Sequence, residues 1–372
     1  INIQDVTLEG GYYPIYVDGD YCTFKNCTFR NCFGDAFKVG DACVVDGWDA
    51  TYGQVLDCDM YNFGESGIDI TGGDYWLVKN TTVHDGVKNR APSEQSTTSK
   101  LNGIMLKNNN IGTVIDGCRI YNIDGPYGAI TIGGDTYYTD PATPPAENLV
   151  VSNNIIHNIN GPSYLVGFIG AKNCSFVNNI IYNCTGSNLV RFMYGLEDHN
   201  PPNYTYFTCT GNTVANNVFY NNTTTYNYME TDDGVHGSND TDLVINNNIV
   251  NGTRNSYFDR AVITHTAMIA SKGYDAASQT ATPQFVDYTN GLIRLDSTSV
   301  VGLDQGLDLS AVVLADYQDT ARFLEDAFDI GPFENRYDSS YGIYCDGTTT
   351  TGWVIPSGFD LSVVTDSTLN RS

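Results

Sequence analysis

The residues best suited to chemistry in this sequence are two basic side chains, Lys107 and Arg191. Only 18 of the 372 residues are Lys or Arg, yet these two lie in short apolar segments, 103–107 and 189–192. A lysine or arginine can accept a proton once burial or neighbouring positive charge lowers its pKa. The sequence therefore predicts Lys107 as a base and Arg191 as an anion-binding group. The alternative is that both are solvated surface residues.

A second set of candidates is acidic. Carboxylates are hard oxygen ligands for Ca²⁺, and a pair of them can carry out glycoside hydrolysis. The acidic candidates are Asp69, Asp135, Glu230, Asp232 and Asp233. Because the chain holds 43 acidic residues, acidic turns without any function are also expected. Calcium is the one cofactor that these residues predict.

Tyrosine is unusually common, with 26 residues, and several lie in long polar insertions. A ring with a polar tip suits sugar stacking and protein contact equally. We take Tyr137 and Tyr204 from these insertions as candidates for substrate binding. Lys38 and Thr131 join them, because they share strand positions with Lys107 and Arg191.

The elements that would position these side chains belong to a repeat of eight residues. Its first and sixth positions are always apolar, and its eighth is Asn in seven copies and Asp in one. This pattern predicts a short strand that ends at a turn, since Asn tolerates the left-handed conformation. The copies are 24–31, 55–62, 78–85, 115–122, 151–158, 176–183, 214–221 and 244–251.

A second kind of segment alternates with the repeat and includes 103–107, 129–132, 165–168 and 189–192. If its apolar residues point inward, period-two alternation sends one set of side chains outward on a single face. That set is Tyr16, Lys38, Asp69, Met105, Lys107, Thr131, Gly167 and Arg191. Five long insertions border this strand, and such loops on a rigid scaffold are where binding residues gather.

Copies of the repeat are separated by 23 to 38 residues, while the strand segments keep their length. This is typical of a solenoid whose coils absorb insertions at their corners. The sequence predicts an all-β fold, a right-handed parallel β-helix of about eight or more coils over 1–270. A C-terminal cap follows over 271–335. An extension over 336–372 is a linker, part of a further module, or a strand exchanged with another copy.

The composition of the chain restricts the kinds of molecule that it can bind. The formal charge of −25 disfavours nucleic acid, because phosphate binding needs a basic surface. The sequence contains no run of 18 apolar residues, so it predicts no membrane span. The fourth repeat position holds Cys27, Cys58 and Cys118, which we expect to be small buried thiols.

Several segments resemble secreted right-handed parallel β-helix proteins of the pectate-lyase-like superfamily, which includes polysaccharide lyases. They are 103–107, 132–136, 145–149, 166–170, 178–183 and 190–193, and 329–334 is similar to a tail of bacterial surface members. The resemblance implies an extracellular or cell-surface protein that acts on an acidic polysaccharide by Ca²⁺-assisted β-elimination. The alternative is a non-enzymatic adhesin, or a filament or sheath subunit that associates with itself through the extension.

Overall fold

The structure is a computed structural model, and it describes most of the chain. The described residues are 1–40, 50–87, 101–125, 127–134, 145–196, 206–231, 242–252, 254–258, 261–322 and 327–335. Contacts divide the chain into a unit of 1–334 and a second unit of 335–372. The predicted extension, 336–372, lies outside the described residues. None of the helices in the described part is long and apolar enough to cross a membrane.

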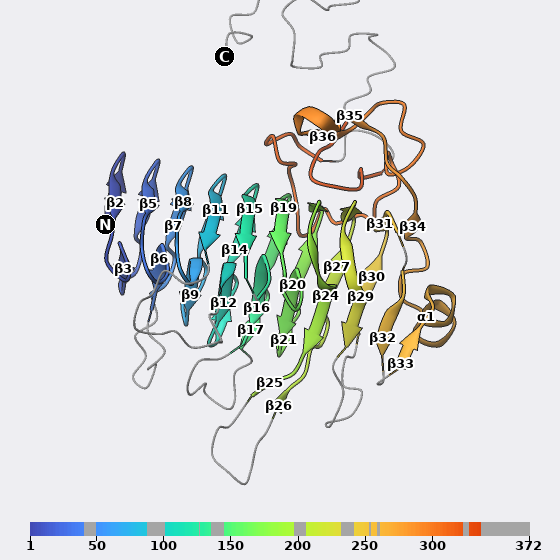
Figure 1. The fold of residues 1–372 in the computed structure, drawn as a ribbon, viewed down its shortest axis with the longest axis horizontal. Coiled ribbons are helices and arrows are strands. Elements are labelled where there is room, and N and C mark those ends of the chain that lie inside the picture. The colour runs from blue at the N-terminus through green and yellow to red at the C-terminus, as the bar shows by residue number, and fades with distance from the viewer. Residues whose placement is uncertain are drawn as a thin grey trace, which may run out of the picture. The chain divides into compact units, whose positions relative to one another are not determined.

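The first unit winds through three rows of short strands, and each coil contributes one strand to each row (Figure 1). The first row is a nine-stranded parallel sheet. Its strands are β1 (Asn2–Gln4), β4 (Thr23–Lys25), β7 (Gln54–Leu56), β10 (Leu77–Lys79), β14 (Val114–Asp116), β18 (Val150–Ser152), β22 (Ser175–Val177), β27 (Thr213–Ala215) and β30 (Val244–Asn246).

The second and third rows together form a 20-stranded sheet. The second row consists of β2 (Thr7–Glu9), β5 (Thr28–Arg30), β8 (Asp59–Tyr61), β11 (Thr82–Val87), β15 (Arg119–Asp124), β19 (Ile155–Asn160), β23 (Ile180–Tyr182), β28 (Val218–Tyr220), β31 (Ile249–Val250) and β34 (Gln279–Thr280). The third row consists of β3 (Tyr16–Val17), β6 (Phe37–Val39), β9 (Ser66–Thr71), β12 (Asn102–Lys107), β16 (Ile130–Gly133), β20 (Val166–Ile169), β24 (Thr185–Met193), β29 (Thr223–Thr231), β32 (Ser256–Phe258) and the antiparallel β33 (Ala261–Ile263).

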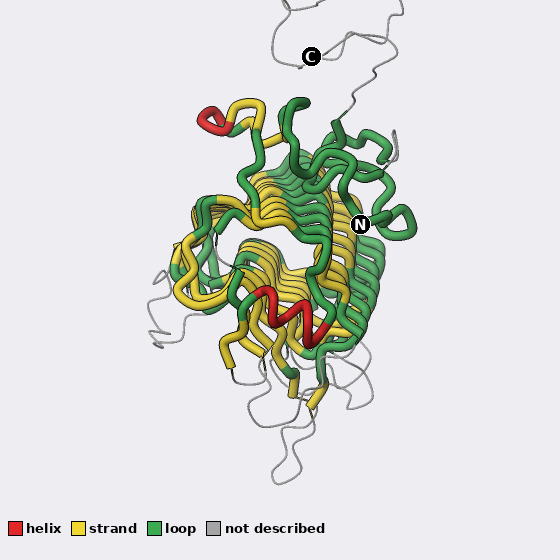
Figure 2. Tube along the Cα trace, turned by 90° about the vertical axis from the view of Figure 1, so that its right-hand side faces the viewer, coloured by secondary structure: helices red, strands yellow, loops and turns green. Residues whose placement is uncertain are grey.

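The remaining elements lie at corners and at the C-terminal end. They are β13 (Asn110–Ile111), β17 (Ala146–Glu147), β21 (Ala171–Lys172), β25 (Gly195–Leu196), β26 (Tyr206–Phe207), α1 (His265–Lys272), β35 (Phe285–Asp287), η1 (Tyr288–Asn290) and β36 (Leu292–Leu295). Figure 2 looks along the stack and shows the coils superposed, with α1 towards the viewer. Met268 of α1 is buried in the main core, so this helix closes the apolar interior at its end. The predicted all-β parallel β-helix is confirmed.

Each copy of the eight-residue repeat is two short strands joined by a bend, not one strand. The third and eighth positions both adopt positive φ, as Asn26 (52°) and Asn31 (57°) show in the first copy. Only the turn at the eighth position was predicted. The third position holds Asn, Asp or Gly in every copy, because these residues enter the left-handed region at least cost.

The fourth position follows that bend and points into the core. The side chain at this position accepts a hydrogen bond from the main-chain N–H of the fourth-position residue in the preceding coil. Asn179 Oδ1 accepts from the N–H of Asn154 (2.8 Å), and Asn217 Oδ1 accepts from the N–H of Asn179 (2.9 Å). The three cysteines predicted at this position are buried, as are the other five cysteines that the structure describes. We call this column the inner ladder.

The last copy of the repeat lies one residue later in the chain than the sequence pattern predicts. Val214 pairs with Ile245 and not with Val244, and Asn217 bonds to Asn248 Oδ1 (3.1 Å) and not to Asn247. Burial agrees, because Val244 is exposed while Ile245 is buried. The run of three Asn residues, 246–248, fits two registers by type, and the core decides between them.

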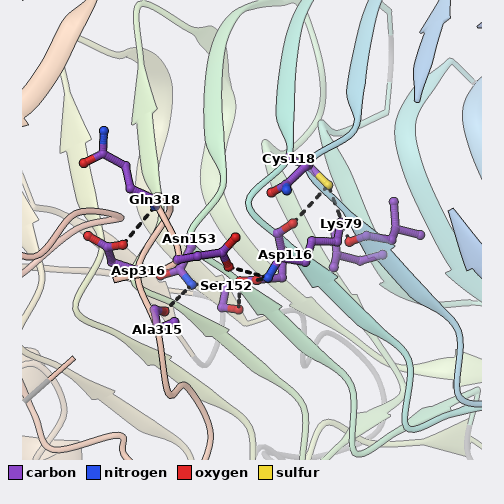
Figure 3. Close-up of polar contacts among 12 residues, drawn as sticks. Lys79, Asp116, Cys118, Ser152, Asn153, Ala315, Asp316 and Gln318 are labelled. Carbon is purple, nitrogen blue, oxygen red and sulfur yellow. Dashed lines mark hydrogen bonds and ion pairs between the residues drawn. The ribbon is translucent and has the colours of Figure 1, made fainter. Parts of the chain in front are cut away.

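The C-terminal segment after β34 packs against the outside of both the first and the second rows of strands. The buried guanidinium of Arg322 donates to Asn153 Oδ1 (2.7 Å) and pairs with Glu334 Oε2 (3.0 Å). Asn153 Nδ2 in turn donates to Asp116 Oδ1 (2.7 Å) and to the Ala315 carbonyl (2.9 Å), as Figure 3 shows. Residues 329–334, which carry the predicted tail motif, therefore belong to the contact that fastens this segment to the coils.

Loss of one side chain of the inner ladder should lower the free energy of unfolding. Replacing Asn179 by Leu leaves the buried N–H of Asn154 without its acceptor. At about 1–3 kcal/mol for each buried group left unpaired, we expect a loss of roughly 3 kcal/mol in the free energy of unfolding, measured in urea. Asn158→Gly is the control, because Asn158 is exposed at φ 54° and Gly keeps that conformation. Equal effects of the two changes would refute the structural role of the ladder.

Candidate functional site

The third row of strands carries one column of residues that faces away from the core. The apolar neighbours of these residues, such as Ile68 and Ile70 beside Asp69, are buried in the main core. We call the set the outer column. In register from coil to coil it consists of Tyr16, Lys38, Asp69, Met105, Thr131, Gly167, Arg191, Glu230 and Tyr257. This register confirms the predicted alignment for seven of the eight residues. Lys107 pairs with Thr71, two residues further along its strand than Met105, and Glu230 and Tyr257 extend the column beyond the prediction.

Two lysines, one from the coil before Asp69 and one from the coil after it, contact the Asp69 carboxylate in the outer column. Lys38 Nζ lies 2.7 Å from Asp69 Oδ2, and Lys107 Nζ lies 3.0 Å from the same oxygen. The hydroxyl of Thr71 donates to Asp69 Oδ1 (2.8 Å) and accepts from Lys38 Nζ (2.7 Å). Both oxygens of Asp69 are therefore engaged by donors.

Asp35 completes this group, just before β6. Its Oδ1 accepts a hydrogen bond from the main-chain N–H of Ser66 (2.8 Å). Burial, followed by repulsion from the Asp69 carboxylate, raises the pKa of Asp35 to about 7. We call Asp35, Lys38, Asp69 and Lys107 the charge cluster. None of the four is more than 7% exposed.

The two carboxyl groups of the cluster are pushed in opposite directions. Burial disfavours the charged form of Asp69, but Lys107 and then Lys38 outweigh it and lower the pKa of Asp69 below its ordinary value. Asp35 has the opposite shift and titrates near neutral pH. Carboxyl groups whose environments separate their pKa values in this way are suited to different roles in acid–base chemistry.

The base role predicted for Lys107 requires a lowered pKa, and the structure gives the reverse. Burial opposes the charged form, but the carboxylates of Asp69 and Asp35 outweigh it and raise the pKa of Lys107. Lys107 is consequently a cation and a proton donor here. Asp35, which the sequence analysis missed, is the group in the cluster that titrates near pH 7.

Further along the outer column, Thr131 is fully buried. Its hydroxyl donates to Asn102 Oδ1 (2.9 Å) and shares a hydrogen bond with the Tyr164 hydroxyl (3.2 Å). The Tyr164 ring lies over Gly167, where an added Cβ would come within 2.5 Å of it. The column is therefore covered by Tyr164 at this point.

Arg191 lies in a later coil and pairs with Glu230 of the next one (3.2 Å). Three coil steps separate the strand of Lys107 from that of Arg191, or roughly 14 Å at the usual strand spacing. The structure does not bring these two predicted residues into one reaction centre. Asp135, Asp232, Asp233, Tyr137 and Tyr204 lie outside the described residues, so their predicted roles stay predictions.

The described acidic candidates do not suit a calcium ion. Two ammonium groups occupy Asp69, and Arg191 occupies Glu230, so a cation would meet positive charge at both. No cluster of three or more His, Cys, Asp or Glu residues in the described part of the chain could hold a metal ion.

Comparisons with known proteins agree with the fold. A sequence model of the family described as right handed beta helix region matches residues 13–191. The chain is thus a right-handed parallel β-helix, as the sequence predicts. No curated protein matches it.

Three solved structures are similar to the chain at low identity. Pectate lyase Pel9A is 15% identical with a TM-score of 0.43, over 87% of this chain and 73% of that one. An alginate lyase from Paenibacillus sp. str. FPU-7 is 12% identical with a TM-score of 0.38, over 70% and 91%. PfbA, a surface adhesin of Streptococcus pneumoniae, is 16% identical with a TM-score of 0.34, over 60% and 50%. These likenesses assign no activity to this chain.

Asp69 should be essential for stability, because it neutralises two buried ammonium groups. We expect Asp69→Asn to lower the free energy of unfolding at pH 7 by about 3–5 kcal/mol, measured in urea. Glu9→Gln is the matched control, since the Glu9–Arg30 ion pair is exposed and solvent screens it. A loss for Asp69→Asn as small as that of the control would contradict the buried pairing.

Asp35 should make stability depend on pH. Its pKa of about 7 in the folded state lies above its ordinary value of 3.8, so the folded state holds the proton more tightly than the unfolded state. Stability therefore falls as the pH rises from the ordinary value to about 7. Asp35→Asn removes the fall. At 1.36 kcal/mol per pKa unit, the variant should gain roughly 2–3 kcal/mol on wild type between pH 5 and pH 8. Parallel stability curves for the two proteins would rule out the raised pKa.

Proposed function

We propose that the protein is a polysaccharide lyase that cleaves an acidic, uronate-containing polymer by β-elimination at the charge cluster. One observation carries the proposal. Asp35, a carboxyl group with a pKa of about 7, shares a solvent-shielded site with the ammonium groups of Lys38 and Lys107. A general base works best when its pKa lies near the operating pH, and buried cations stabilise developing negative charge.

The reaction assigns one role to each group. The ionised Asp35 carboxylate takes the proton from C5 of a uronate unit, whose carboxylate the two lysines hold. The electron pair forms the C4–C5 double bond and the C4–O bond breaks. The leaving oxygen takes a proton from the Lys107 ammonium group. The products are a chain that ends in a 4,5-unsaturated uronate and a chain with a new hydroxyl, and solvent then returns both residues to their starting states.

Hydrolysis by a carboxylate pair fits the same residues less well. It needs a second carboxylate that is free to attack the sugar or to activate water. Lys38, Lys107 and Thr71 occupy the oxygens of Asp69, the other carboxylate of the cluster, and Glu65, whose charge also acts on Asp35, accepts a hydrogen bond from the Tyr12 hydroxyl (2.7 Å). Asp69 therefore suits the task of holding the two lysines in place.

A long polymer matches the linear outer column. Because such polymers occur outside the cell, we propose that the protein acts there. Because none of the four residues is more than 7% exposed, the proposal requires a change of conformation that opens the cluster to the polymer. Loop closure over a reaction centre is common in enzymes, since exclusion of water strengthens the electrostatic interactions.

The assay follows the ultraviolet absorbance of the unsaturated product on polygalacturonate, alginate and chondroitin sulfate. We expect product from at least one polymer, with kcat/KM rising with pH through about 7 as Asp35 ionises. Asp35→Asn should lower kcat by at least about 100-fold, the usual share of a general base. Tyr75→Phe serves as the control, because Tyr75 is exposed and is not part of the outer column.

Product that forms at an unchanged rate with Asp35→Asn would overturn the mechanism. Polymer that binds to wild type without any product would favour the non-enzymatic adhesin over the enzyme. Each polymer is tested with Ca²⁺ and with a chelator, because the acidic candidates Asp135, Asp232 and Asp233 stay predictions. A need for Ca²⁺ would point to them and not to Asp69.

A further inference from the structure

The charge cluster carries an excess of positive charge whenever Asp35 holds its proton. Lys38 and Lys107 contribute one positive charge each, and the carboxylate of Asp69 neutralises only one of them. Glu65, whose charge also acts on Asp35, is only half-buried, so solvent screens it. The four cluster residues are at most 7% exposed, and a buried charge without a partner is costly. The cluster therefore lacks one negative charge.

The two ammonium groups also have N–H donors to spare. Each lysine ammonium group has three N–H donors. Lys38 Nζ donates to Asp69 Oδ2 (2.7 Å) and to Thr71 Oγ1 (2.7 Å). Among the described residues, Lys107 Nζ is paired with Asp69 Oδ2 alone (3.0 Å). Because buried donors normally have acceptors, these contacts leave room for an acceptor from outside the chain.

One carboxylate group would supply both the charge and the acceptors. The two Nζ atoms contact the same oxygen of Asp69, one from the coil before it and one from the coil after it. They are thus close enough for one carboxylate to accept from both lysines, with one oxygen for each. A neutral hydroxyl group would leave the charge unpaired, and a dianion would bring more negative charge than the cluster lacks. The ligand that fits is a monovalent carboxylate.

A carboxylate bound there would act on the ionisation of Asp35. Burial raises the pKa of Asp35, the carboxylates of Asp69 and Glu65 raise it further, and the two lysines lower it. A bound anion would occupy the lysines and add negative charge, so it should raise the pKa of Asp35 again. By linkage, a proton on Asp35 then favours binding of the anion by the same free energy.

We propose that the charge cluster binds the carboxylate of one uronate unit, and that this anion and the proton on Asp35 favour each other's binding. The inference rests on the proposed function, because the uronate unit belongs to the same polymer. In that reaction the bound substrate makes Asp35 a stronger base that ionises at a higher pH.

Binding of galacturonate and of glucuronate is measured by isothermal titration calorimetry at constant chloride, with galactose and glucose as the neutral controls. We expect wild type to bind at least one acid and neither neutral sugar. If the anion raises the pKa of Asp35 by about one to two units, the acid should bind about five- to tenfold more weakly at pH 8 than at pH 6.

Three variants test the parts of the site. Asp35→Asn cannot ionise, so it should bind the acid equally at both pH values, with the affinity of wild type at the lower pH. Lys107→Met should weaken binding by at least about tenfold, because it removes a charged donor. Lys25→Met is its matched control, since Lys25 is exposed on β4 in the first row of strands. Circular dichroism checks each fold, and if Lys107→Met does not fold, the comparison of wild type with Asp35→Asn decides.

Kinetics on a cleaved polymer give a second measure of the coupling. The rise of kcat with pH should lie about one to two units above the rise of kcat/KM, because kcat reports the complex and kcat/KM the free enzyme. Product with both rises at the same pH would refute the coupling and leave the lyase standing.

Absence of acid binding, equal binding at both pH values, or the same pH dependence in Asp35→Asn would overturn the inference. Acid binding that weakens with pH in wild type alone, without product from any polymer, would instead refute the lyase and leave the carboxylate site standing.

Discussion

The hydrogen bond at the corner of each coil is the constraint on which the rest of the molecule depends. After the left-handed third position of the repeat, the main-chain N–H of the fourth position turns into the buried interior, where it needs an acceptor from the protein. The fourth side chain of the next coil supplies the acceptor: a thiol or hydroxyl near the N-terminus, as in Cys58 and Thr81, and an amide further on. Because each acceptor belongs to the neighbouring coil, a coil satisfies its corner only when it is stacked in register.

Strict stacking has a direct consequence for the outer face. Residues at one strand position of successive coils lie within hydrogen-bonding reach, although up to about 40 residues of sequence separate them. Lys38 and Asp69 share one strand position in neighbouring coils, and Lys107 of the following coil lies two residues further along, in register with Thr71; the three meet because these strands are held in register. The scaffold thus stabilises a buried group of charges that would be costly on a less rigid surface.

The same arrangement separates the pKa values of the two carboxyl groups. Asp69 lies between two ammonium groups that lower its pKa, while at Asp35 burial and the Asp69 carboxylate outweigh the same two lysines and raise the pKa to about 7. The neighbours that the fold gives to each carboxyl group thus decide whether it stays ionised or titrates near neutral pH. The proposed chemistry and the predicted pH dependence both arise from this difference.

The sequence by itself determined the β-helix, the turns at the eighth repeat position and the outward face that Lys38, Asp69 and Arg191 share, since these follow from periodicity and from residue types that tolerate positive φ. It did not determine the register of the last copy, where 246–248 are all Asn, nor the bend at the third position. It also missed Asp35 and gave Lys107 the wrong direction of pKa shift. Only the tertiary structure decided these points, because burial and charge at a residue depend on neighbours in adjacent coils, and corner insertions of variable length hide those neighbours in the sequence.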